Sequence, residues 1–106
     1  MIEGYHPECP LCRLAQDREI LTRLVAEDNL IIVVDCLLCQ VPMAVLKAHR
    51  AQFTEEEKGD IRQLMRQFNG EVIDWEQRRI PDHAHCHLRP YPFPGTKQWE
   101  KISTPR

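Results

Sequence analysis

The stretch DHAHCHL, residues 82–88, places a histidine at every second position. In an extended strand, residues two apart share a face, so His83, His85 and His87 lie on one side and the residues between them lie on the other. Packing alone gives no reason for this pattern, because buried imidazoles need polar partners and protonated neighbours repel one another. We therefore predict a strand whose histidine face serves metal binding, phosphate chemistry or both.

Two Cys-x-x-Cys pairs lie upstream of this strand, Cys9/Cys12 and Cys36/Cys39, and Cys86 stands alone. In a reducing compartment such a pair indicates a metal site or a redox pair. One alternative is a Cys₄ zinc site built from both pairs, and another is a redox role. We favour buried, packing thiols for Cys36, Cys39 and Cys86, because the sequence between the second pair lacks the glycine typical of a zinc knuckle.

Two strands and one principal helix are predicted between the cysteines and the triad. Residues 30–34 form a short β-branched run, and residues 41–46 form a second strand with a proline near its start. Thr54 and Glu57 match a capping box, which begins a helix. The apolar residues that follow keep helical spacing, so we predict a helix to about Arg78, ended by Pro81. This stripe comprises Ile61, Leu64, Met65, Phe68, Val72 and Trp75.

The remaining segments complete a single α+β domain over residues 1–106 with an antiparallel sheet. Residues 1–13 are expected to form an irregular arm, and residues 14–26 a mostly helical segment that could hold a short strand over 23–26. In the Pro-rich tail, residues 90–106, we expect Trp99 and Ile102 to dock back. Tyr91, Phe93 and Trp99 could stack on a base, but we favour packing in the core or at a dimer contact for them.

Composition excludes some classes of function. The chain has 106 residues and a net charge of -2, which gives no basic field for tight nucleic-acid binding. No apolar run approaches the ~20 residues of a membrane span, so we expect no membrane partner. Because residues 1–10 are polar and carry no apolar signal region, we expect a cytoplasmic location.

Residues 9–90 resemble the histidine triad (HIT) family. The motif His-Ala-His-Cys-His-Leu-Arg, residues 83–89, matches three histidines separated by single, mostly apolar residues. The pair Cys9/Cys12 is similar to the family's N-terminal zinc knuckle. Residues 27–35 and 41–49 resemble its first core strands, and the capped helix at Thr54 comes where the family has its helix.

The resemblance implies a nucleotide hydrolase or nucleotidyl transferase. The middle histidine, His85, would attack the α-phosphorus of a nucleotide and form a nucleotidyl-histidine intermediate, and His87 would contact phosphate oxygens or the leaving group. Neutral imidazole is a competent nucleophile near pH 7. A carbonyl or carboxylate would have to fix the tautomer of His85. The resemblance also implies a homodimer.

A structural zinc ion is implied as well, held by Cys9, Cys12, His49 and His83 in a closed Cys₂His₂ set. The chain departs from the family just before the triad. Residues 68–82 contain Asn-Gly but no Gly-Gln pair, and Arg89 replaces an apolar residue. The alternative function is therefore a non-catalytic, zinc-stabilised domain of the same type that binds nucleotide or a protein partner.

Overall fold

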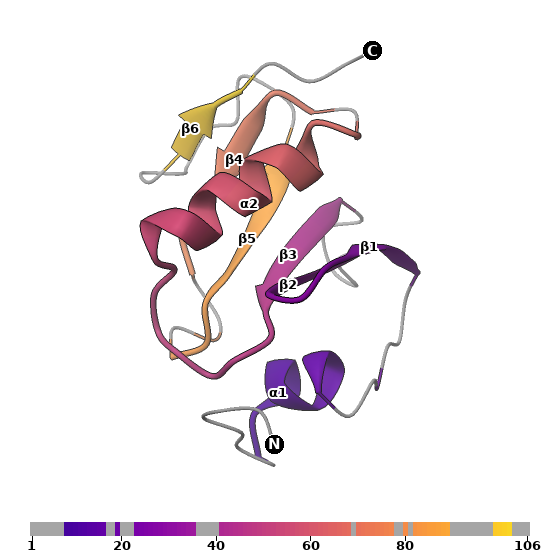
Figure 1. The fold of residues 1–106 in the computed structure, drawn as a ribbon, viewed down its shortest axis with the longest axis vertical. Helices are drawn as coiled ribbons and strands as arrows, with labels where there is room; N and C mark the ends of the chain where they lie inside the picture. The colour runs from indigo at the N-terminus through magenta and orange to yellow at the C-terminus, as the bar shows by residue number, and fades with distance from the viewer. Residues whose placement is uncertain are drawn as a thin grey trace.

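The computed structural model describes residues 8–16, 19, 23–35, 41–68, 70–77, 80, 82–89 and 99–102. The described elements are α1 (Pro10–Ala15), β1 (Leu24–Glu27), β2 (Ile31–Asp35), β3 (Pro42–Leu46), α2 (Glu55–Met65), β4 (Val72–Asp74), β5 (His85–Arg89) and β6 (Trp99–Lys101). The strands form one antiparallel sheet in the order β1-β2-β3-β5-β4-β6. The predicted α+β class and antiparallel sheet are therefore confirmed (Figure 1).

Strands β2 and β3 pair without interruption. Their register joins Ile31 to Leu46 at one end and Asp35 to Pro42 at the other. Residues 31–34 and 43–46 are buried whichever face of the sheet they point to. A strand that is covered on both faces has a continuous run of apolar residues in its sequence. This pattern is the reason that both strands could be predicted. Both predicted strands are confirmed.

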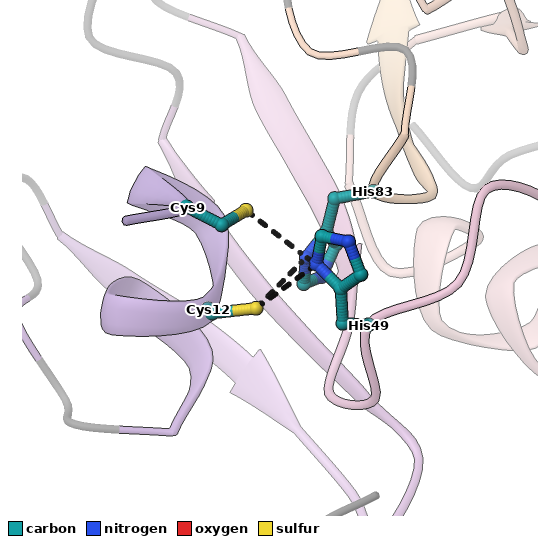
Figure 2. A group of neighbouring side chains, drawn as sticks. All are labelled: Cys9, Cys12, His49 and His83. Carbon is teal, nitrogen blue, oxygen red and sulfur yellow. Dashed lines mark hydrogen bonds between the residues drawn. The ribbon is translucent and has the colours of Figure 1, made fainter. Parts of the chain in front are cut away.

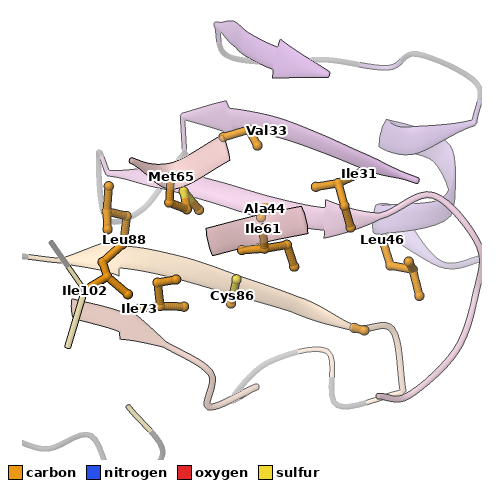
Figure 3. Packing of buried hydrophobic residues seen from close by; sticks show 11 residues of the cluster. Ile31, Val33, Ala44, Leu46, Ile61, Met65, Ile73, Cys86, Leu88 and Ile102 are labelled. Atoms are coloured by element: carbon orange, nitrogen blue, oxygen red, sulfur yellow. The ribbon is translucent and has the colours of Figure 1, made fainter. Parts of the chain in front are cut away.

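Helix α2 covers one face of the sheet (Figures 1 and 3). Ile61 and Met65 of this helix are fully buried in a cluster with side chains from β2, β3, β4 and β5. The residues that alternate with the triad histidines, Ala84, Cys86 and Leu88, belong to the same cluster. The alternation predicted for the triad strand is thereby confirmed on its apolar side, although β5 itself runs from His85 to Arg89.

Helix α1 packs against β2 and β3 through a second apolar cluster. This cluster contains Leu11, Cys12 and Ala15 of α1. It also contains side chains of β2 and β3 that point away from α2, such as Ile32 and Val45. The sheet therefore lies between the two helices. The sequence predicted an irregular arm over residues 1–13. This prediction is wrong for residues 10–13, which belong to α1. Pro10 at the first helical position starts α1, since its fixed φ suits a helix.

The long helix predicted from Thr54 to about Arg78 is wrong in its second half. Helix α2 ends at Met65, and Val72–Asp74 is strand β4, paired with β5 and β6. Gly70 lies against Leu88, and an added Cβ there would come within 2.5 Å of the Leu88 side chain. After this close contact the chain enters the sheet as β4, where long-range strand pairing outweighs the helical spacing of Val72.

Two further predictions are corrected at the ends of the chain. Among the described residues of the range 14–26, only Leu14 and Ala15 are helical, because α1 ends at Ala15. The short strand considered over 23–26 forms as β1. Ile102 docks into the core at 9% exposure, but Trp99 is 46% exposed and does not pack there. An edge-strand position explains this, because β6 has a neighbour on one side only among the described strands.

The predicted packing roles of Cys36, Cys39, Tyr91 and Phe93 concern residues outside the described part of the chain. The same holds for the expectation that His6 is a surface residue. Within the described part of the chain, no helix has both the length and the apolar character needed to cross a membrane.

Candidate functional site

Strand pairing brings two of the four predicted metal ligands together. Strands β3 and β5 are antiparallel neighbours, so the end of β3 lies beside the start of β5. His49 follows β3, and His83 precedes β5. The amide of Ala84 donates to the Arg50 carbonyl at 2.6 Å, which fastens the two flanking segments to each other. The two imidazole rings meet edge to face, with their centroids 5.0 Å apart.

Helix α1 supplies the other two predicted ligands. Cys9 is the N-cap residue of this helix and Cys12 lies one turn later, so both thiols point to the same side. Gln16 at the C-cap donates through Nε2 to the Lys47 carbonyl at 2.8 Å, which ties α1 to the segment that carries His49. Both cysteines are buried, at 8% and 0% exposure.

The four side chains converge on one point (Figure 2). His83 Nδ1 lies 3.4 Å from the Sγ atoms of both Cys9 and Cys12, and 3.2 Å from His49 Nδ1. Cys12 Sγ lies 3.1 Å from His49 Nδ1. A tetrahedral ion with bonds of about 2.0–2.3 Å to nitrogen and sulfur spaces its ligand atoms about 3.3–3.8 Å apart. The four residues therefore fit a metal ion with only small adjustments.

The outward nitrogen of each imidazole lies near an oxygen atom. His83 Nε2 donates to the Leu46 carbonyl at 2.7 Å, which leaves Nδ1 with the lone pair that a metal ion needs. His49 Nε2 lies 3.6 Å from Asp82 Oδ2, the side chain of an exposed carboxylate. Burial lowers the pKa of His83 and outweighs the opposite effect of the Leu46 carbonyl, so the ring is neutral near pH 7. These arrangements are those of histidines that bind a metal through Nδ1.

His85 and His87, the two predicted catalytic residues, lie beside this centre. Their rings are 5.9 Å apart between centroids, and the residues are 5% and 8% exposed. His85 Nδ1 lies 2.8 Å from the backbone carbonyl of His83. A carbonyl can only accept, so Nδ1 carries the proton and Nε2 keeps its lone pair. Burial lowers the pKa of His85 against the opposing effect of this hydrogen bond, which also favours the neutral ring.

An ion pair that the sequence did not reveal lies next to the histidines. Arg89 follows His87 by two residues and shares its face, and its Nε donates to Asp74 Oδ2 at 2.8 Å. Asp74 is fully buried and lies directly opposite His87 in the β4–β5 register. The other Asp74 oxygen accepts from the Glu76 amide at 3.1 Å. A carboxylate this deeply buried needs such partners to remain charged.

Arg89 could have been found from the alternation of the triad strand, which places residues 83, 85, 87 and 89 on one face. Asp74 could not, because its place depends on the pairing of β4 with β5. In the sequence it looks like part of a helix, and only the tertiary structure places it next to the histidines.

Comparison with models of known protein families, with curated proteins and with solved structures finds no match to this chain. The geometry of the site therefore carries the functional conclusion.

Proposed function

We propose that the chain is a histidine-triad-type domain that hydrolyses or transfers a nucleotidyl group through His85. The observation that carries the proposal is the hydrogen bond from His85 Nδ1 to the His83 carbonyl. It supplies the tautomer-fixing group that the mechanism requires, and it leaves Nε2 as a neutral nucleophile. The resemblance of residues 83–89 to the family motif and the antiparallel sheet that carries them support the same assignment.

The proposed reaction has two steps. His85 Nε2 attacks the α-phosphorus of a nucleoside phosphoramidate or dinucleoside polyphosphate, and the bond from that phosphorus to the leaving group breaks. His87 contacts the phosphate oxygens or the leaving group, which takes up a proton as it departs. Water then attacks the phosphorus of the nucleotidyl-histidine, the P–N bond breaks, and the nucleotide and free His85 are released.

The metal ion of the proposal is zinc, held by Cys9, Cys12, His49 and His83. Two thiolates and two imidazoles form a closed Cys₂His₂ set, which is typical of structural zinc. All four positions of a tetrahedral ion are then filled by protein, so the ion supplies no open position for substrate. Its role is to fasten α1 to the sheet and to hold His83, whose carbonyl orients His85.

Replacement of His85 by Ala tests the catalytic assignment. We expect turnover of a nucleoside phosphoramidate to fall on the order of 1,000-fold or more, because the nucleophile itself is removed. Intact-protein mass spectrometry after a rapid quench at neutral pH should detect a nucleotidyl adduct in the wild type and none in His85→Ala. His87→Ala should still form the adduct, but more slowly. Unchanged turnover in His85→Ala would exclude the proposal.

Metal analysis tests the zinc assignment separately. Protein purified without added zinc should contain close to one equivalent per chain, and Cys9→Ser together with Cys12→Ser should lose it. A cobalt-substituted sample should show the absorption of tetrahedral thiolate coordination. Retention of the metal by the double variant would exclude this ligand set.

The non-catalytic alternative has one observation in its favour. His85 and His87 are only 5% and 8% exposed, which restricts access to the proposed nucleophile. A wild-type protein that contains one zinc ion and binds nucleotide, but turns over no substrate, would favour this alternative. The homodimer stays a prediction, to be checked by sedimentation.

A further inference from the structure

Trp99 combines exposure with a place on the histidine face of the sheet. It lies in the edge strand β6 and is 46% exposed, the highest value among the large apolar side chains of the described residues. In the register of the sheet, Trp99 pairs with Asp74, and Asp74 pairs with His87. These three residues therefore form a row across three strands.

Alternation along β6 gives the side of the sheet to which Trp99 belongs. The next residue, Glu100, accepts two hydrogen bonds from Arg62 of α2, at 2.6 and 2.9 Å, so Glu100 faces the helix. Its neighbour in the strand must point to the opposite face. That face also carries His85 and His87, since Cys86 between them lies in the cluster under α2.

The spacing of this row suits a mononucleotide. Neighbouring strands are about 4.8 Å apart, so the backbone of Trp99 lies about 10 Å from that of His87. Both side chains project from the same face of the sheet. A nucleotide whose phosphate meets the histidines has its base at the other end of the molecule, which extends across β4 towards Trp99.

Charge along the row does not oppose such a ligand. Asp74 lies between Trp99 and His87, and an unpaired carboxylate there would repel a phosphate. The 2.8 Å hydrogen bond from Arg89 Nε neutralises this carboxylate within the sheet. The row thus offers two histidines, a neutralised ion pair and an exposed indole.

We propose that Trp99 stacks on the base of the nucleotide and gives the site its preference for substrates with an aromatic base. This inference rests on the proposed nucleotide function and extends it to specificity. An indole is a large π surface that stacks on any base, and stacking strength grows with the size of the base. The site should therefore prefer purine to pyrimidine nucleotides.

Binding of adenosine 5′-monophosphate and of ribose 5-phosphate, which lacks the base, tests this role. Trp99→Ala should weaken binding of the nucleotide about 5- to 150-fold and leave binding of ribose 5-phosphate unchanged. The affinity of Trp99→Phe for the nucleotide should lie between those of wild type and Trp99→Ala, because phenylalanine keeps a smaller aromatic ring. The difference in tryptophan fluorescence between wild type and Trp99→Phe is the contribution of Trp99. The nucleotide should quench this contribution.

Leu24→Ala is the matched control, because Leu24 is 40% exposed on the opposite edge strand, β1. It should leave binding of both ligands unchanged. Equal weakening of both ligands by Trp99→Ala, or no weakening of either, would overturn the role of Trp99. So would a loss of self-association, measured by sedimentation, without a change in ligand selectivity.

Two results separate this inference from the proposed function. If wild type binds neither ligand, the nucleotide function and the role of Trp99 both fail. If Trp99→Ala weakens only the nucleotide while His85→Ala retains full turnover, Trp99 binds the base and the catalytic assignment alone fails.

Discussion

His83 serves two neighbours with different atoms. Its ring nitrogen Nδ1 faces the two cysteine thiols, and its backbone carbonyl accepts the hydrogen bond from His85. The candidate metal ligands are therefore connected to His85 through a single residue. Every substitution at position 83 keeps the backbone carbonyl. The direction of this carbonyl depends on the contacts that fix the His83 ring.

Substitution by alanine should have opposite effects on the stability of the fold at Gly59, inside α2, and at Gly70, after its end. At Gly70 an added Cβ would come within 2.5 Å of Leu88, a core side chain with 1% exposure. Gly70→Ala should therefore destabilise the fold by about 1–3 kcal/mol. At Gly59, inside α2, a Cβ meets nothing within 4 Å, so Gly59→Ala should stabilise it by about 0.5–1 kcal/mol.

Urea denaturation of both variants measures these changes in the free energy of unfolding. Equal midpoints for Gly70→Ala and wild type would show that Leu88 can move aside.

Asp60 of α2 and Asp28, which precedes β2, are neighbouring carboxyl groups, and the opposite shifts of their pKa values point to one shared proton. The hydrogen bond with Asp28, together with burial, raises the pKa of Asp60 to about 6. Burial raises the pKa of Asp28, but hydrogen bonds from Asp60 and from the Leu30 and Ile31 amides outweigh it and lower that pKa. The folded protein thus holds a proton on Asp60 that the unfolded chain releases near pH 4.

The stabilising contribution of this proton is present below pH 4 and is lost as the pH rises through about 6. Asp60→Asn keeps a donor to Asp28 at every pH. Solvent screens the partly exposed pair, so we expect a gain of about 1 kcal/mol at pH 8 and no change at pH 4. Thermal melts from pH 4 to 8 measure the effect. A gain that is the same at both ends of this range would rule out the shared proton.

At the scale of elements, α2 begins where the sequence predicts. Thr54 Oγ1 accepts from the Glu57 amide at 3.2 Å, and Glu57 Oε1 accepts from the Thr54 amide at 2.7 Å. Glu57 is also bound by Arg50 through both carboxylate oxygens. Its pKa is lowered because these hydrogen bonds outweigh the opposing effect of burial. The capping box therefore also anchors the loop that leads from His49 into α2.

Loss of the Thr54 hydroxyl should destabilise the N-terminus of α2. Thr54→Ala should lower the free energy of unfolding by about 1 kcal/mol, because the Glu57 amide loses its acceptor. Thr54→Ser keeps the oxygen and is the matched control. Guanidinium denaturation of the three proteins measures the difference, and indistinguishable midpoints for Ala and Ser would count against the capping box.

The end of α2 shows where periodicity fails as a predictor. Val72 and Trp75 continue the helical spacing of Leu64 and Phe68, yet Val72 lies in β4 and pairs with Arg89. Start signals such as a capping box are local, so a sequence contains them completely. The residues of β5 and β6 that pair with β4 lie 13 or more residues away along the chain, and no local pattern encodes that pairing.

At the scale of the whole molecule, the candidate metal site joins α1 to the face of the sheet opposite α2. A chain of this size buries a limited core, and a metal ion adds stability that the unfolded chain lacks. Removal of the metal by a chelator should lower the melting temperature by on the order of 10 °C or more. Calorimetry with and without added zinc measures this change.

Thiol titration shows whether the loss is local to the centre. After chelation, Cys9 and Cys12 should react, which adds about two thiols per native chain. Cys86 is fully buried, and burial raises the pKa of its thiol, so it should stay unreactive until the protein unfolds. A variant with Cys9→Ser and Cys12→Ser should show no increase on chelation.

The sequence by itself indicated the four candidate metal ligands and the two candidate catalytic histidines. The alternation over residues 83–88, the Cys-x-x-Cys spacing and the capping box at Thr54 are local patterns, and each depends on neighbours only a few residues away. The tertiary structure alone decided that Cys9, Cys12, His49 and His83 meet, that the His83 carbonyl orients His85, and that Asp74 pairs with Arg89. These contacts join residues through strand register and helix docking, which depend on how the whole apolar surface is buried.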